Sequence, residues 1–142
     1  MAAMNGGADH QDRASRAREF GAAQDRRRQR ESEQAQALVD RFVQDAVRAG
    51  LPTEELTARP WSGGGRYRTG IEGWYLKRDR SVGISREGDY HVLVVAPRRR
   101  GRWRTLRLDP VPPPLVVGEG ARDGESVALE TLLRIRLESG GQ

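Results

Sequence analysis

The sequence predicts an α+β fold with an N-terminal amphipathic helix, an antiparallel meander sheet of four to five strands and a C-terminal helix. Three patterns support this prediction. Apolar residues recur every three to four positions over residues 35–47, short alternating runs fill the middle of the chain, and leucines recur at helical spacing over residues 129–137. A chain of 142 residues has the size of one domain. We therefore expect a single small α+β domain at residues 35–140, preceded by an N-terminal extension at residues 1–34 that is disordered or loosely helical.

The N-terminal extension lacks the large apolar side chains that a packed helix needs. Residues 1–12 are rich in Gly, Ala, Asn and Asp and show no periodicity, which predicts a disordered tail. Residues 13–30 favour a helix by propensity, but Phe20 is their only large apolar residue. A helix in this segment would need support from a partner or from a second copy of the chain.

The helix predicted at residues 35–47 carries one apolar stripe, which consists of Ala35, Leu38, Val39, Phe42, Val43, Ala46 and Val47. Gly50 and Pro52 form a stop signal after it. Thr53, followed by two glutamates, is typical of an N-cap. We therefore expect a short second helix that begins after Thr53 and ends before Pro60.

Short runs in which apolar and polar residues alternate predict the strands of the meander. These strands are expected at residues 71–77, 81–85, 89–95 and 103–108, with 115–117 as a further edge strand. Residues 89–95 are apolar on both faces, which is typical of a central strand. Prolines between residues 110 and 114 predict a stiff connection after the fourth strand. The last helix, at residues 130–137, is expected to cover one face of the sheet.

The composition excludes several kinds of chemistry. The chain has no cysteine, which excludes disulfides, thiolate nucleophiles and cysteine-based metal sites. Residues 1–36 contain no apolar segment typical of a signal peptide, and no apolar run is long enough to span a membrane. We therefore expect a cytoplasmic protein without a membrane partner.

Only two side chains could serve as bases at neutral pH, His10 and His91. His10 lies in the expected tail, and His91 is interpreted as a half-buried strand residue with a hydrogen-bonded ring. No nearby pattern of Ser and Asp suggests a triad. We predict no catalytic residues, no cofactor and no metal, and an enzyme with a site in a sheet cleft stays open as an alternative.

The charge of the chain is unevenly distributed. Residues 1–50 carry a net charge of +1 (nine Arg, eight acids), residues 51–108 a net charge of +7 (twelve Arg, one Lys, six acids) and residues 109–142 a net charge of −3 (three Arg, six acids). This layout would steer a polyanion or an acidic protein toward the middle segment. Lys77 is the only lysine, and an arginine bias of this kind is also produced by a GC-rich genome.

The strongest candidate site is a basic loop made of Arg98, Arg99, Arg100, Arg102, Trp103 and Arg104, at the expected tip of a hairpin. Guanidinium groups pair with phosphate oxygens and an indole can stack on an unpaired base, so the combination is typical of nucleic-acid contact. Arg66, Arg68, Lys77, Arg78 and Arg80 could extend this patch. The alternative is a solvated hairpin in which Trp103 packs on the sheet.

A glycine-rich segment at residues 118–124 stands where phosphate-binding loops occur, between a strand and a helix. Its glycine spacing does not fit such loops, and nearby acids at positions 119, 123 and 125 would repel a phosphate. The same acids do not fit an EF-hand. We interpret the segment as a solvated turn.

These patterns favour a non-enzymatic binding module over an enzyme. The first hypothesis is contact with nucleic acid or a ribonucleoprotein through the basic loop. The second is a protein-interaction or regulatory module in which residues 13–49 dock on a protein partner or on a second copy.

Overall fold

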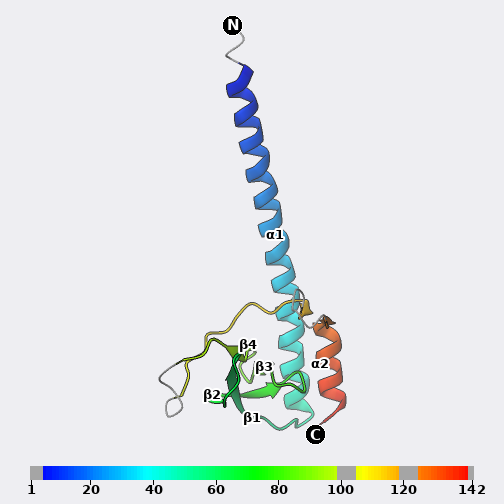
Figure 1. The fold of residues 1–142 in the computed structure, drawn as a ribbon. Coiled ribbons are helices and arrows are strands. Elements are labelled where there is room, and N and C mark those ends of the chain that lie inside the picture. The colour runs from blue at the N-terminus through cyan, green and yellow to red at the C-terminus, as the bar shows by residue number, and fades with distance from the viewer. Residues whose placement is uncertain (1–4, 99–104, 119–124, 141–142) are drawn as a thin grey trace.

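The structure, a computed structural model, describes residues 5–98, 105–118 and 125–140, with side chains from Asp9 onward. It is an α+β fold in which a long N-terminal helix, a five-stranded and mostly antiparallel sheet and a C-terminal helix follow in chain order, as the sequence predicted (Figure 1). The elements are α1 (Asn5–Arg48), β1 (Glu54–Pro60), β2 (Tyr67–Tyr75), β3 (Val82–Ser85), β4 (Tyr90–Val92), β5 (Val94–Val95), β6 (Val116–Val117), β7 (Val127–Ala128) and α2 (Leu129–Glu138).

Helix α1 is one continuous helix of 44 residues. It begins at Asn5, inside the stretch to residue 12 for which the sequence predicted no structure, and it continues without a break into the predicted helix at 35–47. The predicted stop signal is confirmed, because the helix ends at Arg48 and Gly50 has a φ of 70°. A positive φ of this kind is the conformation that ends many helices at glycine.

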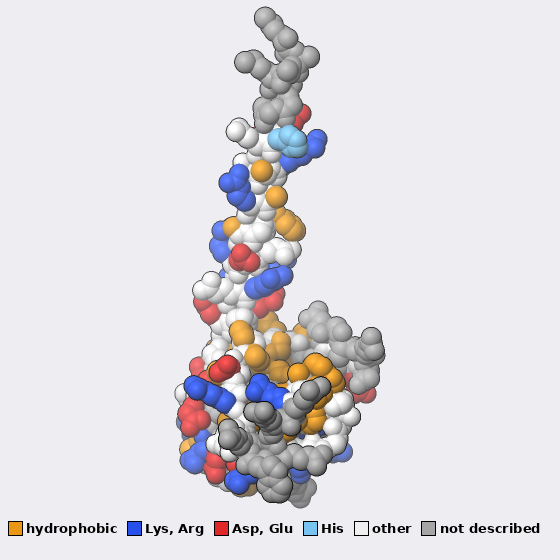
Figure 2. Space-filling model, turned by 60° about the vertical axis from the view of Figure 1, so that its left-hand side comes forward, with side chains coloured by type: hydrophobic (Ala, Val, Ile, Leu, Met, Phe, Trp, Pro, Cys, Tyr) orange, Lys and Arg blue, Asp and Glu red, His pale blue; other side chains and the backbone are white. Residues whose placement is uncertain are grey.

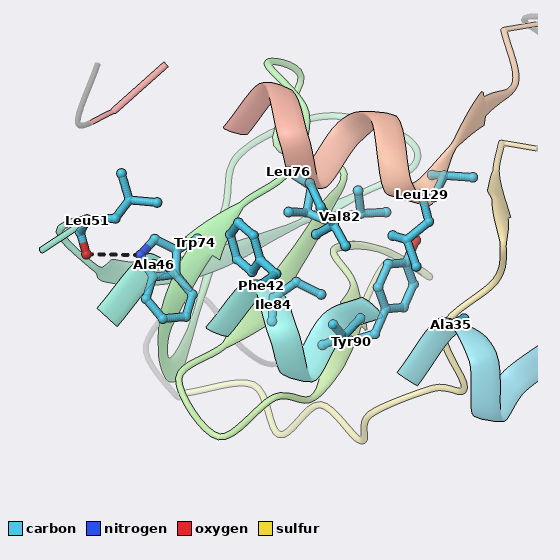
Figure 3. Close-up of a cluster of buried hydrophobic side chains, with 13 residues drawn as sticks. Ala35, Phe42, Ala46, Leu51, Trp74, Leu76, Val82, Ile84, Tyr90 and Leu129 are labelled. Atoms are coloured by element: carbon cyan, nitrogen blue, oxygen red, sulfur yellow. Dashed lines mark hydrogen bonds between the residues drawn. The ribbon is translucent and has the colours of Figure 1, made fainter. Parts of the chain in front are cut away.

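The second half of α1 forms the core of the protein with the sheet. Its buried stripe consists of Ala35, Val39, Phe42 and Ala46, four of the seven residues that the periodicity selected. The ring of Phe42 meets Trp74 of β2 edge to face, with 5.5 Å between the ring centroids. The indole Nε1 of Trp74 donates a hydrogen bond to the Leu51 carbonyl at 3.1 Å (Figure 3). The helix, the turn that follows it and the sheet are thereby held together.

The short helix expected after Thr53 is wrong, because residues 54–60 form strand β1. Leu56, Ala58 and Pro60 are buried at every second position, which is the period of a strand. Burial of these three side chains therefore outweighs the local N-cap signal of Thr53. The register of β1 against β2 shifts between Leu56 and Thr57, and the Thr69 hydroxyl donates a hydrogen bond to the Leu56 carbonyl at this bulge.

The next two predicted strands are confirmed. β2 begins at Tyr67, four residues before the predicted start at 71, and β3 covers most of the predicted segment 81–85. Val82 and Ile84 point into the core, as expected, together with Trp74 (Figure 3).

The prediction of residues 89–95 as a central strand is wrong, because the segment lies at both edges of the sheet. The strand order is β4-β3-β2-β1-β5, and Leu93 alone separates β4 from β5. The Leu93 amide donates to the Ser81 carbonyl at 2.8 Å, and the Leu93 carbonyl accepts from the Arg59 amide at 2.8 Å. The sheet therefore closes on itself into a small barrel at Leu93. Closure explains why this segment is apolar on both faces.

Side chains on the inner face of the barrel meet across it. A Cβ placed on Gly83 would lie 2.9 Å from Cδ1 of Leu56 and 3.3 Å from Cδ1 of Leu93. Both leucines are fully buried. Glycine at position 83 is therefore required by the close approach of neighbouring side chains inside the barrel.

The chain after the barrel differs from the prediction in two ways. Residues 105–108 do not form a strand, although the Leu106 amide donates to the Arg68 carbonyl at 2.7 Å, and residues 103–104 lie outside the described part. β6 pairs with β7 in a separate two-stranded ribbon instead of extending the main sheet. The predicted last helix is confirmed as α2, which lies beside α1 and adds Leu129 and Leu133 to the core (Figure 1).

Replacing Phe42 by Ala tests the core contact of α1. We expect Phe42→Ala to lower the free energy of unfolding by about 3–5 kcal/mol, because it removes a buried ring and leaves a cavity beside Trp74. Val47 on the same helix is 61% exposed, so Val47→Ala should change this free energy by no more than about 0.5 kcal/mol. Urea titrations of both variants measure the difference, and equal losses would contradict the assignment of the buried stripe.

Candidate interaction surfaces

The first half of α1 projects away from the rest of the protein. From Asp9 to Gln34 every side chain is exposed except Gln24 and Ser32, which are partly exposed. We call these residues, 9–34, the projecting arm (Figures 1 and 2). The first anchored positions follow immediately, since Ala35 is fully buried and the Gln36 amide donates to the Gly88 carbonyl at 2.9 Å.

Three exposed residues of the arm continue the line of the first core residues of α1. Positions 18 residues apart lie on the same line along an α-helix, because 18 residues make about five full turns. Ala17, Phe20 and Gly21 therefore continue the line of Ala35, Leu38 and Val39, which pack in the core. Phe20 is 68% exposed. The arm thus presents two small residues and one large apolar ring on the face that the domain buries elsewhere.

The rest of the arm is a mixture of charges. It contains seven arginines and six acids, a net charge of +1, and blue and red side chains alternate along it (Figure 2). Its side-chain hydrogen bonds are local, from Arg18 to the Ala14 carbonyl at 3.3 Å and from Gln29 to Glu33 at 3.5 Å. A helix of this composition is marginal in water without tertiary cover. Packing of Phe20 and its neighbours against a second surface would stabilise it.

The predicted basic loop is described only at its first residue. Arg98 is exposed, and Tyr67 holds its backbone: the tyrosine hydroxyl accepts from the Arg98 amide at 3.3 Å and donates to the Arg98 carbonyl at 3.4 Å. Arg99, Arg100, Arg102, Trp103 and Arg104 lie outside the described residues. Their contact with nucleic acid stays a prediction.

The basic residues expected to extend this loop are engaged with neighbours on the barrel. Four of the five have a local interaction. Arg68 pairs with Glu55 at 3.1 Å, and the Lys77 Nζ lies 3.9 Å from the Asp79 carboxylate. Arg66 donates a hydrogen bond to the Thr57 hydroxyl, and the Arg80 guanidinium lies over the Tyr75 ring, 5.3 Å from its centroid. Such partners compete with an external phosphate for the same guanidinium and ammonium groups.

His91 lies in a groove with a volume of about 470 Å³. The groove is lined by Gly70, Ile71, Glu72, Ser85, Arg86, Glu87, Asp89, His91, Leu108 and Pro110. The histidine is 4% exposed, and its Nδ1 has no hydrogen-bond partner among the described residues. The sequence-based expectation of a half-buried, hydrogen-bonded ring is therefore wrong.

The His91 groove does not assemble a catalytic arrangement. The Ser85 hydroxyl accepts a hydrogen bond from the Asp89 amide at 3.0 Å, and no hydrogen bond joins Ser85 to His91 in the described part of the chain. Burial lowers the pKa of His91, while the negative charges of Asp89 and Glu87 act to raise it. A depressed pKa keeps the ring neutral at physiological pH.

Residues 5–98, 105–118 and 125–140 contain no group of three or more His, Cys, Asp or Glu placed to hold a metal ion. None of the helices in these ranges is long and apolar enough to cross a membrane. Residues 119–124 of the glycine-rich segment lie outside this range, so their interpretation as a solvated turn stays a prediction.

Comparisons of the chain with known protein families, with curated proteins and with solved structures found no match. Of the surfaces described, Phe20 was visible in the sequence as an isolated large apolar residue. Its alignment with Leu38 required the knowledge that one unbroken helix joins them.

The buried His91 predicts a specific dependence of stability on pH. Its pKa in the folded protein lies below the ordinary value of 6.5, so the unfolded chain binds a proton more readily. The stabilisation by the neutral ring is complete above about pH 6.5 and is lost as the pH falls through the folded-state pKa. We expect the urea midpoint of the parent to fall between pH 7.5 and 5.5, and His91→Gln to reduce this fall. The same slope in both proteins would contradict the assignment.

Proposed function

We propose that this protein is a non-enzymatic protein-interaction module whose projecting arm, residues 9–34, docks along a helix of a partner protein. The observation that supports this most strongly is the exposed apolar face of Ala17, Phe20 and Gly21, which continues the line of Ala35, Leu38 and Val39. An amphipathic helix that lacks a partner surface in its own chain is a common docking element.

The chemistry of the arm fits a partner helix better than other surfaces. Small residues allow two helix backbones to approach closely, and a single aromatic ring between them can act as an anchor. The mixed charges around this face suit contacts with a partner of mixed charge at the rim of the interface. A net charge of +1 gives the arm little attraction for a nucleic-acid backbone.

The domain provides a rigid base for the arm. Helix α1 is anchored from Ala35 onward by its buried stripe and by the bond from Gln36 to Gly88. The direction in which the arm leaves the domain is therefore set by core packing. Docking would order the arm further without a rearrangement of the barrel.

A set of three variants tests the proposal. Deletion of residues 1–31 removes most of the arm, Phe20→Ser removes its anchor, and Val47→Ser changes a matched residue on the same helix that is 61% exposed. We expect the deletion to leave the urea midpoint of the domain unchanged, because no fully buried side chain precedes Ala35 in the described part of α1.

Binding is then measured in two ways with these proteins. Affinity purification from cells that express the parent, combined with sedimentation equilibrium, should detect a protein partner or self-association that is lost in the deletion, weakened about tenfold or more by Phe20→Ser and kept by Val47→Ser. Self-association would identify the partner as a second copy. Monomeric behaviour with the same co-purifying proteins for parent and deletion would contradict the proposal.

A second candidate function, contact with nucleic acid through Arg98–Arg104, is favoured by the fixation of the Arg98 backbone on Tyr67. These two bonds fix the backbone at Arg98, the first residue of the loop. We expect mixed-sequence RNA or DNA to bind the parent with an affinity that falls steeply with salt, and the variant with Arg98, Arg99, Arg100 and Arg102 replaced by Ala to lose this binding. Fluorescence anisotropy at low and moderate salt measures it. Equal affinities for parent and variant would reject the loop as a phosphate-contacting element.

A further inference from the structure

A second groove, with a volume of about 760 Å³, lies between the closing edge of the barrel and the β6–β7 ribbon. We call it the valine groove, because its walls include Val82, Val92, Val94, Val111, Val116 and Val117. Grooves and cavities of roughly 300–1,000 Å³ are typical of small-molecule sites. Its lining contains no residue of the projecting arm and does not contain Arg98.

The walls of this groove expose apolar surface that the fold leaves uncovered. Val92 is 43% exposed, Val111 38% and Val116 37%. The other exposed large apolar residues, Phe20, Val47, Trp61 and Ile135, do not line this groove. Three exposed valines that converge on one concavity form a surface suited to an aliphatic or aromatic body.

Arg59 brings to the groove a buried nitrogen that lacks a hydrogen-bond partner among the described residues. Arg59 comes from β1 beside the closure point, where its backbone amide is bonded to the Leu93 carbonyl at 2.8 Å. Its Nε is buried and has no hydrogen-bond partner among the described residues. A buried guanidinium donor without an acceptor is costly, so an acceptor supplied by a ligand would stabilise it.

The positive charge of Arg59 favours an anion as this acceptor, because no ion pair joins Arg59 to a carboxylate among the described residues. Lys77 also lines the groove, and its Nζ lies 3.9 Å from the Asp79 carboxylate. Burial opposes ionisation of Asp79, but hydrogen bonds from Ser81 and the charges of Lys77 and Arg59 hold its pKa below the ordinary value of 3.8. Asp79 is therefore ionised, and its ion pair is with Lys77. Glu125 lines the groove but is exposed, and no ion pair joins it to Arg59 or Lys77 in the described chain.

Tyr90 adds a neutral donor on the same wall. Burial raises the pKa of its hydroxyl to about 12, so the group stays protonated at physiological pH. No hydrogen bond joins this hydroxyl to another described residue. A phenol hydroxyl and a guanidinium with an unpartnered Nε, beside an apolar wall, match an oxygen anion attached to an apolar body.

We propose that the valine groove binds a small carboxylate with an aliphatic body, the carboxylate on the Arg59 guanidinium and the chain along Val92, Val111 and Val116. The carboxylate offers the guanidinium group a charged acceptor, and the chain covers the exposed valines. Arg59 is favoured over Lys77 as the main contact because Lys77 forms an ion pair with Asp79, whereas Arg59 forms none with a described residue.

The test is a titration of the full chain with sodium octanoate, followed by amide chemical shifts in two-dimensional NMR spectra. We expect saturable shifts at Val92, Val94, Val111 and Val116. Matched titrations with 1-octanol and octylamine, which keep the chain and change the head group, should show affinities weaker by about tenfold or more. Because these titrations use the unaltered protein, the test does not depend on the folding of a variant.

Two substitutions locate the head-group contact. Arg59→Met keeps the unbranched side chain and removes the guanidinium, so octanoate affinity should fall by about tenfold or more, whereas Arg107→Met at an exposed position should leave it unchanged. Equal affinities for octanoate and octanol, an unaltered affinity in a folded Arg59→Met variant, or shifts confined to other surfaces would overturn the proposal. The absence of shifts at millimolar octanoate would overturn it as well.

Discussion

The contact between Phe42 and Trp74 is the interaction on which the rest of the structure depends. Trp74 joins three parts of the chain, because its ring packs against α1, its backbone belongs to β2 and its Nε1 bonds to the Leu51 carbonyl of the connecting turn. The position of α1 on the sheet is thereby fixed in both translation and rotation. Since the helix is unbroken from Asn5 to Arg48, this packing also fixes the direction of the arm, whose side chains are exposed apart from the partly exposed Gln24 and Ser32.

Closure of the barrel at Leu93 is the second constraint, and it creates the valine groove. The two hydrogen bonds of Leu93 bring β1 beside β5, and this places Arg59 next to the valines of the closing edge. The ribbon β6–β7 forms the opposite wall. The same closure leaves His91 buried on the inner face, and its Nδ1 has no hydrogen-bond partner among the described residues. Arg59 Nε and His91 Nδ1, the two buried side-chain atoms without a partner in this part of the chain, therefore both lie near the closure.

Local periodicity was enough to predict those parts of the fold that local interactions determine. Three elements were predicted correctly, at residues 35–47, 81–85 and 130–137. In each of them the apolar residues recur with a single period and mark the one face that is buried. The prediction of a helix after Thr53 was wrong because an N-cap signal is local. Leu56 and Ala58 are instead buried through the pairing of β1 with β2, which lies later in the chain. The central strand at 89–95 was wrong because two-sided apolar composition also fits a strand that joins both edges of a barrel. The valine groove was not predictable, since Arg59, Val92 and Val116 meet only through closure and the ribbon.

Amide hydrogen exchange along α1 tests the central claim most directly, that one helix serves as core in its second half and as an uncovered docking surface in its first. In dilute, partner-free protein, amides of residues 38–46 should exchange only through global unfolding, whereas amides of residues 10–30 should exchange many orders of magnitude faster through local fraying. A sharp rise in protection near Ala35 is the predicted result. Uniform protection along the whole helix in a monomer would contradict the account, because it would mean that the arm is already packed against its own chain.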